Sequence, residues 1–171
     1  MRFKKNIEEI LNKQINAEFW SAYLYLSMSS FLAQKGFSGF ANWMHVQYQE
    51  EVSHALKLFN YILSRGGSVK LAPIEAVETE WKGVQEIFES TYHHECLVTD
   101  MINDCYELAI KERDHATANM LQWFIDEQVE EEESAMEILD KLKIIGEKGA
   151  GLYMLDRELG SRTFTDETQA D

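Results

Sequence analysis

The sequence predicts an all-α protein, a four-helix bundle with a long crossover between its second and third helices and a short fifth C-terminal helix. Apolar residues recur at spacings of three and four along four long stretches, which is the period of a helix face packed on a core. Only one proline interrupts the 171 residues. A chain of this length can bury a core without disulfides. We therefore expect one domain over residues 1–160 and a loose, polar tail over 161–171.

The first two helices are expected over residues 6–34 and 39–65. Gly36 lies where the first helix must end, because glycine readily takes the left-handed conformation that closes a helix. Ser38 is a plausible N-cap for the second helix, since a serine oxygen can accept from a free amide of the first turn.

The connection after the second helix is unusually long and lacks a helical period. It covers residues 66–82 and contains the single proline. Seventeen extended residues reach about 55 Å, whereas a 27-residue helix is only about 40 Å long. The segment can therefore run the whole length of the bundle, which would make the helices on either side parallel. Further helices are expected over 83–111, 115–145, with Asp114 as N-cap, and 152–159.

Each long helix has an apolar seam, meaning the line of residues at spacings of three and four that is expected to face the core. Each seam contains one acidic residue close to mid-length: Glu18, Glu51, Glu95 and Glu131. Helix midpoints lie at one level of a bundle, so these side chains should converge together with His54 and Gln128, each three residues from a seam acid. One pair of carboxylates at 4 Å repels by about 4 kcal/mol at an effective dielectric of 20. Two divalent ions would balance four such charges, and carboxylates with one imidazole favour iron or manganese.

Each part of this pattern also has an ordinary explanation. A single Glu-x-x-His pair such as Glu51 and His54 is common by chance on helix surfaces, and the acidic run 130–133 resembles a solvated face. Tyr25 alone would be a core tyrosine with one hydrogen bond. His93, His94 and His115 are expected to be exposed. The coincidence of a mid-length seam acid on all four helices favours the metal site.

Composition excludes several other classes of protein. A net charge of −14 disfavours binding to the negatively charged backbone of nucleic acid. There is no apolar run of 18 residues, so no membrane partner is expected. Cys96 and Cys105 would lie about 13 Å apart along one helix, too far to form a disulfide with each other. Free thiols predict a cytoplasmic location.

Five stretches resemble prokaryotic non-haem ferritins, and the resemblance extends along essentially the whole chain. They are AEFWSAYLY (17–25), QEEVSHALKLFNYI (49–62), YHHE (92–95), NMLQWFIDEQVEEE (119–132) and GLYMLDREL (151–159). The resemblance implies a ferritin-like bundle that assembles into a hollow 24-subunit shell, with the fifth helix lining a symmetry channel.

The resemblance also implies a role for each residue of the predicted centre. The first iron would be held by Glu18, Glu51 and His54, and the second by Glu51, Glu95 and Glu131, with Glu51 bridging. Gln128 would be a hydrogen-bonding neighbour or a weak ligand of the second iron. A third iron would be held by Glu50, Glu127, Glu130 and Glu131. Tyr25 matches a tyrosine that is a candidate electron donor.

Departures from related families narrow the expected function. Val52 stands where bacterioferritin-like proteins have a haem-ligating methionine, so no haem is expected. Rubrerythrins would need an added cysteine-rich domain, which is not expected here because no closely spaced pair of cysteines occurs. We expect an iron-storage protein with ferroxidase activity, which oxidises Fe(II) with O2 or H2O2 and deposits Fe(III) as a mineral core. The alternatives are a dinuclear-iron oxidase or peroxidase without storage, and a metal-free adaptor bundle.

Overall fold

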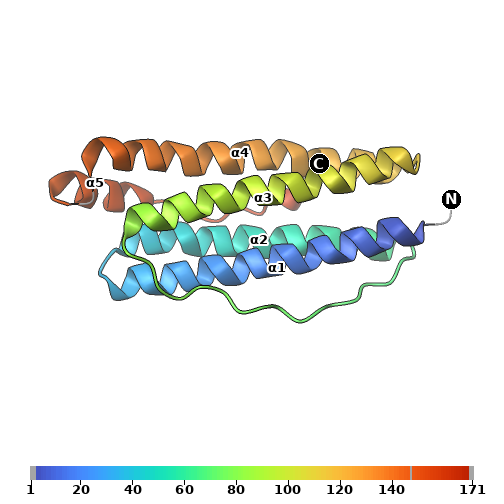
Figure 1. The fold of residues 1–171 in the computed structure, drawn as a ribbon, viewed down its shortest axis with the longest axis horizontal. Coiled ribbons are helices and arrows are strands. Elements are labelled where there is room, and N and C mark those ends of the chain that lie inside the picture. The colour runs from blue at the N-terminus through green and yellow to red at the C-terminus, as the bar shows by residue number, and fades with distance from the viewer. Residues whose placement is uncertain (1–2, 147, 170–171) are drawn as a thin grey trace.

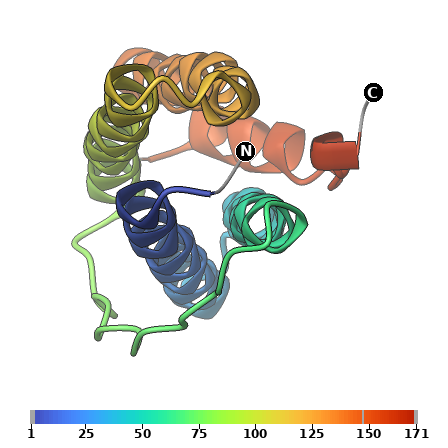
Figure 2. The same cartoon turned by 90° about the vertical axis from the view of Figure 1, so that its right-hand side faces the viewer.

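The computed structural model describes residues 3–146 and 148–169, and within these it contains five α-helices and no strand. The four long helices are α1 (Lys5–Gln34), α2 (Ser38–Ser64), α3 (Val84–Lys111) and α4 (His115–Ile145). The short helix α5 (Ala150–Leu159) and a 3-10 turn, η1 (Glu167–Gln169), follow. The predicted fold class is confirmed, because the four long helices form one bundle with α5 at one end (Figures 1 and 2).

The crossover between α2 and α3 runs the length of the bundle, so these two helices are parallel (Figure 1). Asparagines of α1 hold it in place. Asn12 donates to Ser68 O at 3.0 Å and accepts from Lys70 N at 2.6 Å, while Asn16 donates to Pro73 O at 3.2 Å. These bonds satisfy backbone groups that an irregular segment would otherwise leave to water.

The apolar core consists of two clusters, one toward each end of the bundle. Met28, Leu32 and Phe88 belong to the cluster nearer α5, and Leu11 and Leu121 to the other. Between them every long helix contributes buried polar side chains from the middle of its seam. The interruptions of the four seams therefore form one polar layer across the bundle.

The ends of the four long helices lie within one residue of the predictions, α5 begins at Ala150, two residues earlier than predicted, and the cap of α2 differs. Gly36 has φ of 87° directly after α1, and Asp114 accepts from Thr117 N at 3.2 Å to cap α4. Ser38 is instead the first residue of α2 and makes no capping bond. The cap comes from α5, because Asp156 Oδ1 accepts from the amides of Gly39 and the following residue, each at 2.9 Å.

Close packing of α5 on α2 explains the glycine at position 39. A Cβ there would lie 1.5 Å from the carbonyl oxygen of Asp156. The described residues include no helix with the length and apolar character that crossing a membrane requires.

Candidate metal centre

The polar layer holds one carboxylate from each long helix, and all four are nearly inaccessible to solvent: Glu18, Glu51, Glu95 and Glu131. Their exposed fractions are 1%, 1%, 0% and 5%. Buried carboxylates are costly unless they are protonated, paired or bound to a metal. The layer is thus built from side chains that need a cation or protons.

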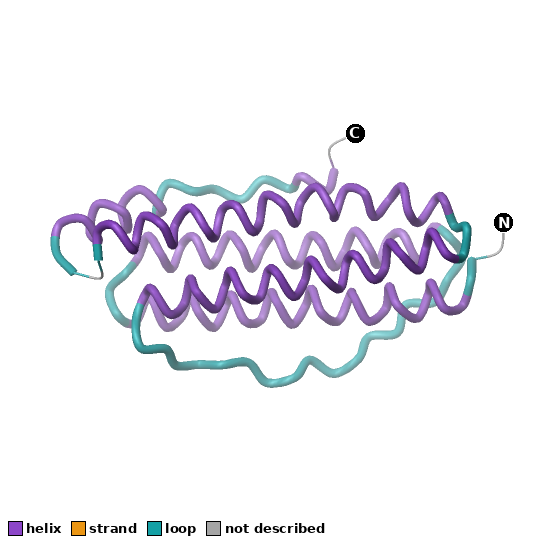
Figure 3. The backbone as a smooth tube through the Cα atoms, turned by 45° about the horizontal axis from the view of Figure 1, so that its top comes forward, coloured by secondary structure: helices purple, strands orange, loops and turns teal. Residues whose placement is uncertain are grey.

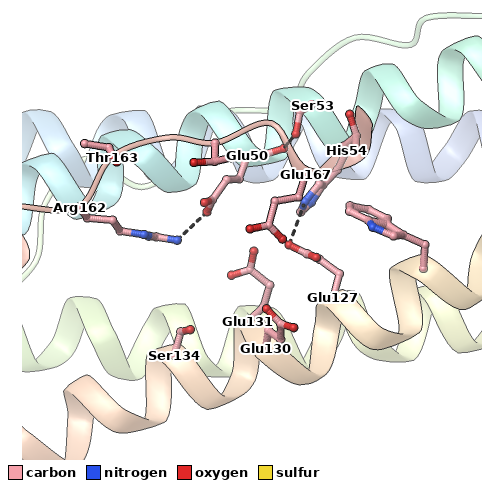
Figure 4. A pocket seen from close by; sticks show the side chains of 13 residues that line it. Glu50, Ser53, His54, Glu127, Glu130, Glu131, Ser134, Arg162, Thr163 and Glu167 are labelled. Atoms are coloured by element: carbon pink, nitrogen blue, oxygen red, sulfur yellow. Dashed lines mark hydrogen bonds and ion pairs between the residues drawn. The ribbon is translucent and has the colours of Figure 1, made fainter. Parts of the chain in front are cut away.

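His54 joins two groups of possible ligands. One ligand atom from each of Glu18, Glu51 and His54 lies within 4.8 Å of the others, and the same is true of His54, Glu127 and Glu131. The Nδ1 atom of His54 is 3.7 Å from Glu51 Oε2, and its Nε2 is 3.6 Å from Glu127 Oε1 (Figure 4). The structure therefore brings together the three residues predicted for the first iron.

Glu95 is held by two donors and belongs to neither of these groups. It accepts from the hydroxyl of Tyr25 and, at 3.2 Å, from Nε2 of Gln128. The structure groups Glu131 with His54 and Glu127 rather than with Glu95. The predicted ligand set of the second iron, which includes Glu95, stays a prediction.

In the absence of metal, Glu51, Glu95 and Glu131 have pKa values above the usual range of a carboxylate. Burial and the nearby charge of Glu131 raise the pKa of Glu95 to about 8. Burial likewise raises the pKa of Glu51 and that of Glu131 above the usual range. Desolvation lowers the pKa of His54, but the nearby carboxylates of Glu127 and Glu51 outweigh it, so that this pKa is well above its ordinary value. A divalent cation would replace these protons with metal charge.

The ferritin-like domain family matches residues 8–145, which is most of the chain. This protein belongs to the ferritin-like family. It is 43% identical to a bacterial non-heme ferritin of Bacteroides fragilis over 92% of this chain and 98% of the relative. It is 42% identical to a probable bacterial non-heme ferritin-like protein of Haemophilus influenzae, over 92% and 95% of the two chains. The resemblance to prokaryotic non-haem ferritins is confirmed.

Solved ferritin structures share the fold almost completely. An Archaeoglobus fulgidus ferritin engineered into a closed form is 50% identical and has a TM-score of 0.94, covering 95% of this chain and 99% of that one. An open pore ferritin from the same archaeon is 49% identical, with a TM-score of 0.93 and the same coverage. At these identities the likeness extends beyond the fold to the family.

Three buried glutamines of this ferritin each donate to a carboxylate of the layer. Gln14 Nε2 lies 2.9 Å from Glu18 Oε1, and Gln47 Nε2 lies 2.7 Å from Glu131 Oε2. The third is Gln128, which faces Glu95. Gln14 and Gln47 lie in the seams of α1 and α2, but neither was among the residues predicted for the site. Their signal was a polar residue one helical turn before a seam acid, where an aliphatic residue would otherwise pack.

His94 is not exposed, which corrects the prediction from sequence. Its Nε2 lies 2.8 Å from Ser21 Oγ, and its ring packs 5.3 Å from that of Trp20 and 6.0 Å from that of Tyr25. Burial, with the nearby His93, lowers the pKa of His94 to about 4. The imidazole is therefore neutral near pH 7. His93 and His115 are exposed, as predicted.

A cavity of about 220 Å³ adjoins the layer between α2, α4 and the C-terminal segment (Figure 4). The four residues predicted to hold a third iron all line it: Glu50, Glu127, Glu130 and Glu131. Glu50 also accepts from Arg162 Nη2 at 2.7 Å. Burial raises the pKa of Glu50 to about 7 although Arg162 opposes the shift. The cavity is thus an acidic chamber next to His54.

Proposed function

We propose that this ferritin stores iron by oxidising Fe(II) at a dinuclear centre within each chain. Family membership supports iron binding and storage in general. The specific proposal rests on one observation, the buried layer of four carboxylates and His54 between two apolar clusters. Burial raises the pKa values of Glu51, Glu95 and Glu131, so that without metal protons offset the cost of burying them, and two divalent cations would balance the four charges instead.

Glu18, Glu51 and His54 are proposed to hold one Fe(II), and Glu51, Glu95 and Glu131 the other. Two adjacent ions can pass two electrons to one oxidant. Dioxygen that accepts these electrons and two protons leaves as hydrogen peroxide, and hydrogen peroxide that accepts them leaves as water. Oxygen ligands then favour the harder Fe(III) ion over Fe(II).

The neighbours of the centre are proposed to position its ligands. Gln128 orients Glu95 through the bond at 3.2 Å and is in reach as a weak ligand. Tyr25, which donates to Glu95, is the candidate source of a further electron. The cavity beside His54 is the proposed position of a third iron.

Storage requires assembly, and we propose a 24-subunit cytoplasmic shell with no haem. The similar Archaeoglobus structures are an open pore ferritin and a ferritin engineered into a closed form, which supports a shell. Fe(III) leaving the centre would collect inside it as a mineral core.

Size and iron content separate this proposal from the main alternative. A dinuclear-iron oxidase or peroxidase without storage would use the same ligands but elute as a monomer or dimer with a few irons per chain. We expect gel filtration after aerobic Fe(II) loading to show one large assembly that carries iron far in excess of its chains. Small particles that retain only a few irons per chain would overturn the storage proposal.

A further inference from the structure

After α5 the chain turns back along the bundle (Figure 3), and η1 lies against α2. The segment 161–169, here called the strap, lies along the acidic cavity, which Thr163, Thr165 and Glu167 help to line. Two anchors connect it to the bundle, one at each of its ends. The strap is therefore a wall of the cavity in which a third iron is proposed.

Arg162 makes the first anchor. Its Nη2 donates to Glu50 Oε2 at 2.7 Å, and its guanidinium lies 4.5 Å from the centre of the Trp43 ring. Its backbone oxygen accepts from Asn42 Nδ2 at 2.9 Å. Both Arg162 and Glu50 are mostly shielded, with side-chain exposures of 25% and 19%. A shielded pair of this kind interacts more strongly than an exposed one.

Lys57 makes the second anchor. Its Nζ donates to the backbone oxygen of Thr168 at 3.0 Å and lies 4.4 Å from the centre of the Trp123 ring. Trp123 in turn packs edge-on against His54, with ring centroids 5.4 Å apart. The far end of the strap is thus coupled through one aromatic side chain to a proposed metal ligand.

The first anchor uses a carboxylate that the third iron would also need. Among the described residues that line the cavity, Arg162 is the only one with a permanent positive charge. A metal ion on Glu50 and the guanidinium at its present distance would compete for the same oxygens and repel each other. Glu50 therefore cannot bind the metal ion and the Arg162 guanidinium tightly at the same time.

We propose that Arg162 is the resident counter-cation of Glu50, and that a metal ion entering the third position displaces it and releases the strap. The inference rests on the proposed third position. The loose tail expected from the sequence would then depend on metal binding, because the strap is docked without the third ion and released with it. Arg162 thereby sets the affinity of the third position and is a positioning residue, not a ligand.

Zinc titration tests the competition without redox chemistry. Zn²⁺ binding to the metal-free assembly is measured by calorimetry for the wild type, Arg162→Gln and Arg162→Lys. We expect the weakest of three binding steps to tighten about tenfold in Arg162→Gln, because one competing charge is gone. Arg162→Lys should remain close to the wild type, and the two tighter steps should not change. The matched control is Arg157→Gln, which makes the same substitution on the exposed side of α5.

Hydrogen exchange of the strap gives a second readout. In the wild type, saturating the third step should speed exchange of the peptide covering 161–169, while the first two steps leave it slow. In Arg162→Gln the strap should exchange fast at every zinc level. A folding defect would instead raise exchange in α5 and α2 as well.

The outcomes separate this inference from the function on which it rests. The role of Arg162 alone would be overturned if each of the three zinc-binding steps had the same affinity in the wild type and in Arg162→Gln. It would also be overturned if hydrogen exchange of the strap did not change at the third step. Only two steps in every variant would overturn the third position and this role together. The dinuclear centre would still stand in that case.

Discussion

Raising the pH from 7 to 8.5 should destabilise the metal-free protein, because buried carboxylates must then lose protons that they hold in the folded state. Glu95 has a folded pKa of about 8 against 4.5 for the free side chain. Between these values the folded state binds more protons than the unfolded state. Stability therefore falls as the pH rises, the opposite of the behaviour of a carboxylate in a salt bridge.

Glu95 and Glu50 contribute losses that follow directly from their pKa values. From pH 7 to 8.5 Glu95 alone should cost about 1.2 kcal/mol of unfolding free energy. Glu50, with a pKa of about 7, should add about 0.4 kcal/mol. The raised pKa values of Glu51 and His54 act in the same direction. His94, with its pKa of about 4, is neutral throughout this range and contributes little.

Urea unfolding of the chelator-treated protein, followed by circular dichroism at fixed protein concentration, measures this slope. Glu95→Gln is the matched variant, since it keeps the shape of the side chain but cannot titrate. It should remove about 1 kcal/mol of the pH-dependent loss. Saturating Zn²⁺ should abolish the loss in the wild type, because metal-bound carboxylates have no proton to lose. Stability that rises with pH, or equal slopes in the two proteins, would refute the reasoning.

Four further substitutions test three separate contacts. Gln47→Leu removes the donor to Glu131 and should weaken zinc binding at the dinuclear centre roughly tenfold, as measured by calorimetry. An unchanged affinity would show that this amide does not position the Glu131 carboxylate. Tyr25→Phe should slow Fe(II) oxidation in stopped-flow absorbance while zinc affinity stays unchanged, and equal loss of both would argue for a structural role instead. Asp156→Ala removes the cap of α2 and should lower the free energy of unfolding by about 1 kcal/mol. Gly39→Ala should lower the free energy of unfolding further, because its Cβ would collide with the carbonyl oxygen of Asp156. Thermal melts that match the wild type would contradict this packing.

The fold was predictable because its determinants are local or depend only on length. Seam periods locate the four long helices, and the 17 residues of 66–82 suffice to span the bundle. The level of the metal layer was predictable for the same reason. Glu18 and Glu51 lie mid-helix whichever way the helices run, so their convergence with His54 needed no knowledge of side-chain conformation.

Apart from the bonds of Gln14 and Gln47, the contacts that were missed join residues far apart in the chain and involve residues outside the seams. Arg162 meets Glu50 across 112 positions, and Asp156 caps α2 in place of Ser38 because α5 folds back onto it. His94 follows no seam period, and only the packing of α1 against α3 buries it beside Trp20. Such contacts depend on how elements dock, which the hydrophobic pattern of each element alone does not specify.

Anaerobic Fe(II) titration followed by a pulse of oxygen tests the central claim most directly. The account predicts that two Fe(II) ions per chain bind tightly and are oxidised together in a fast phase, and that Glu51→Gln, which removes the proposed bridge, abolishes this phase. The shell of that variant should elute as the wild type does. Tight binding of two Fe(II) ions without fast oxidation, or a fast phase that survives Glu51→Gln, would contradict a dinuclear ferroxidase centre in this layer.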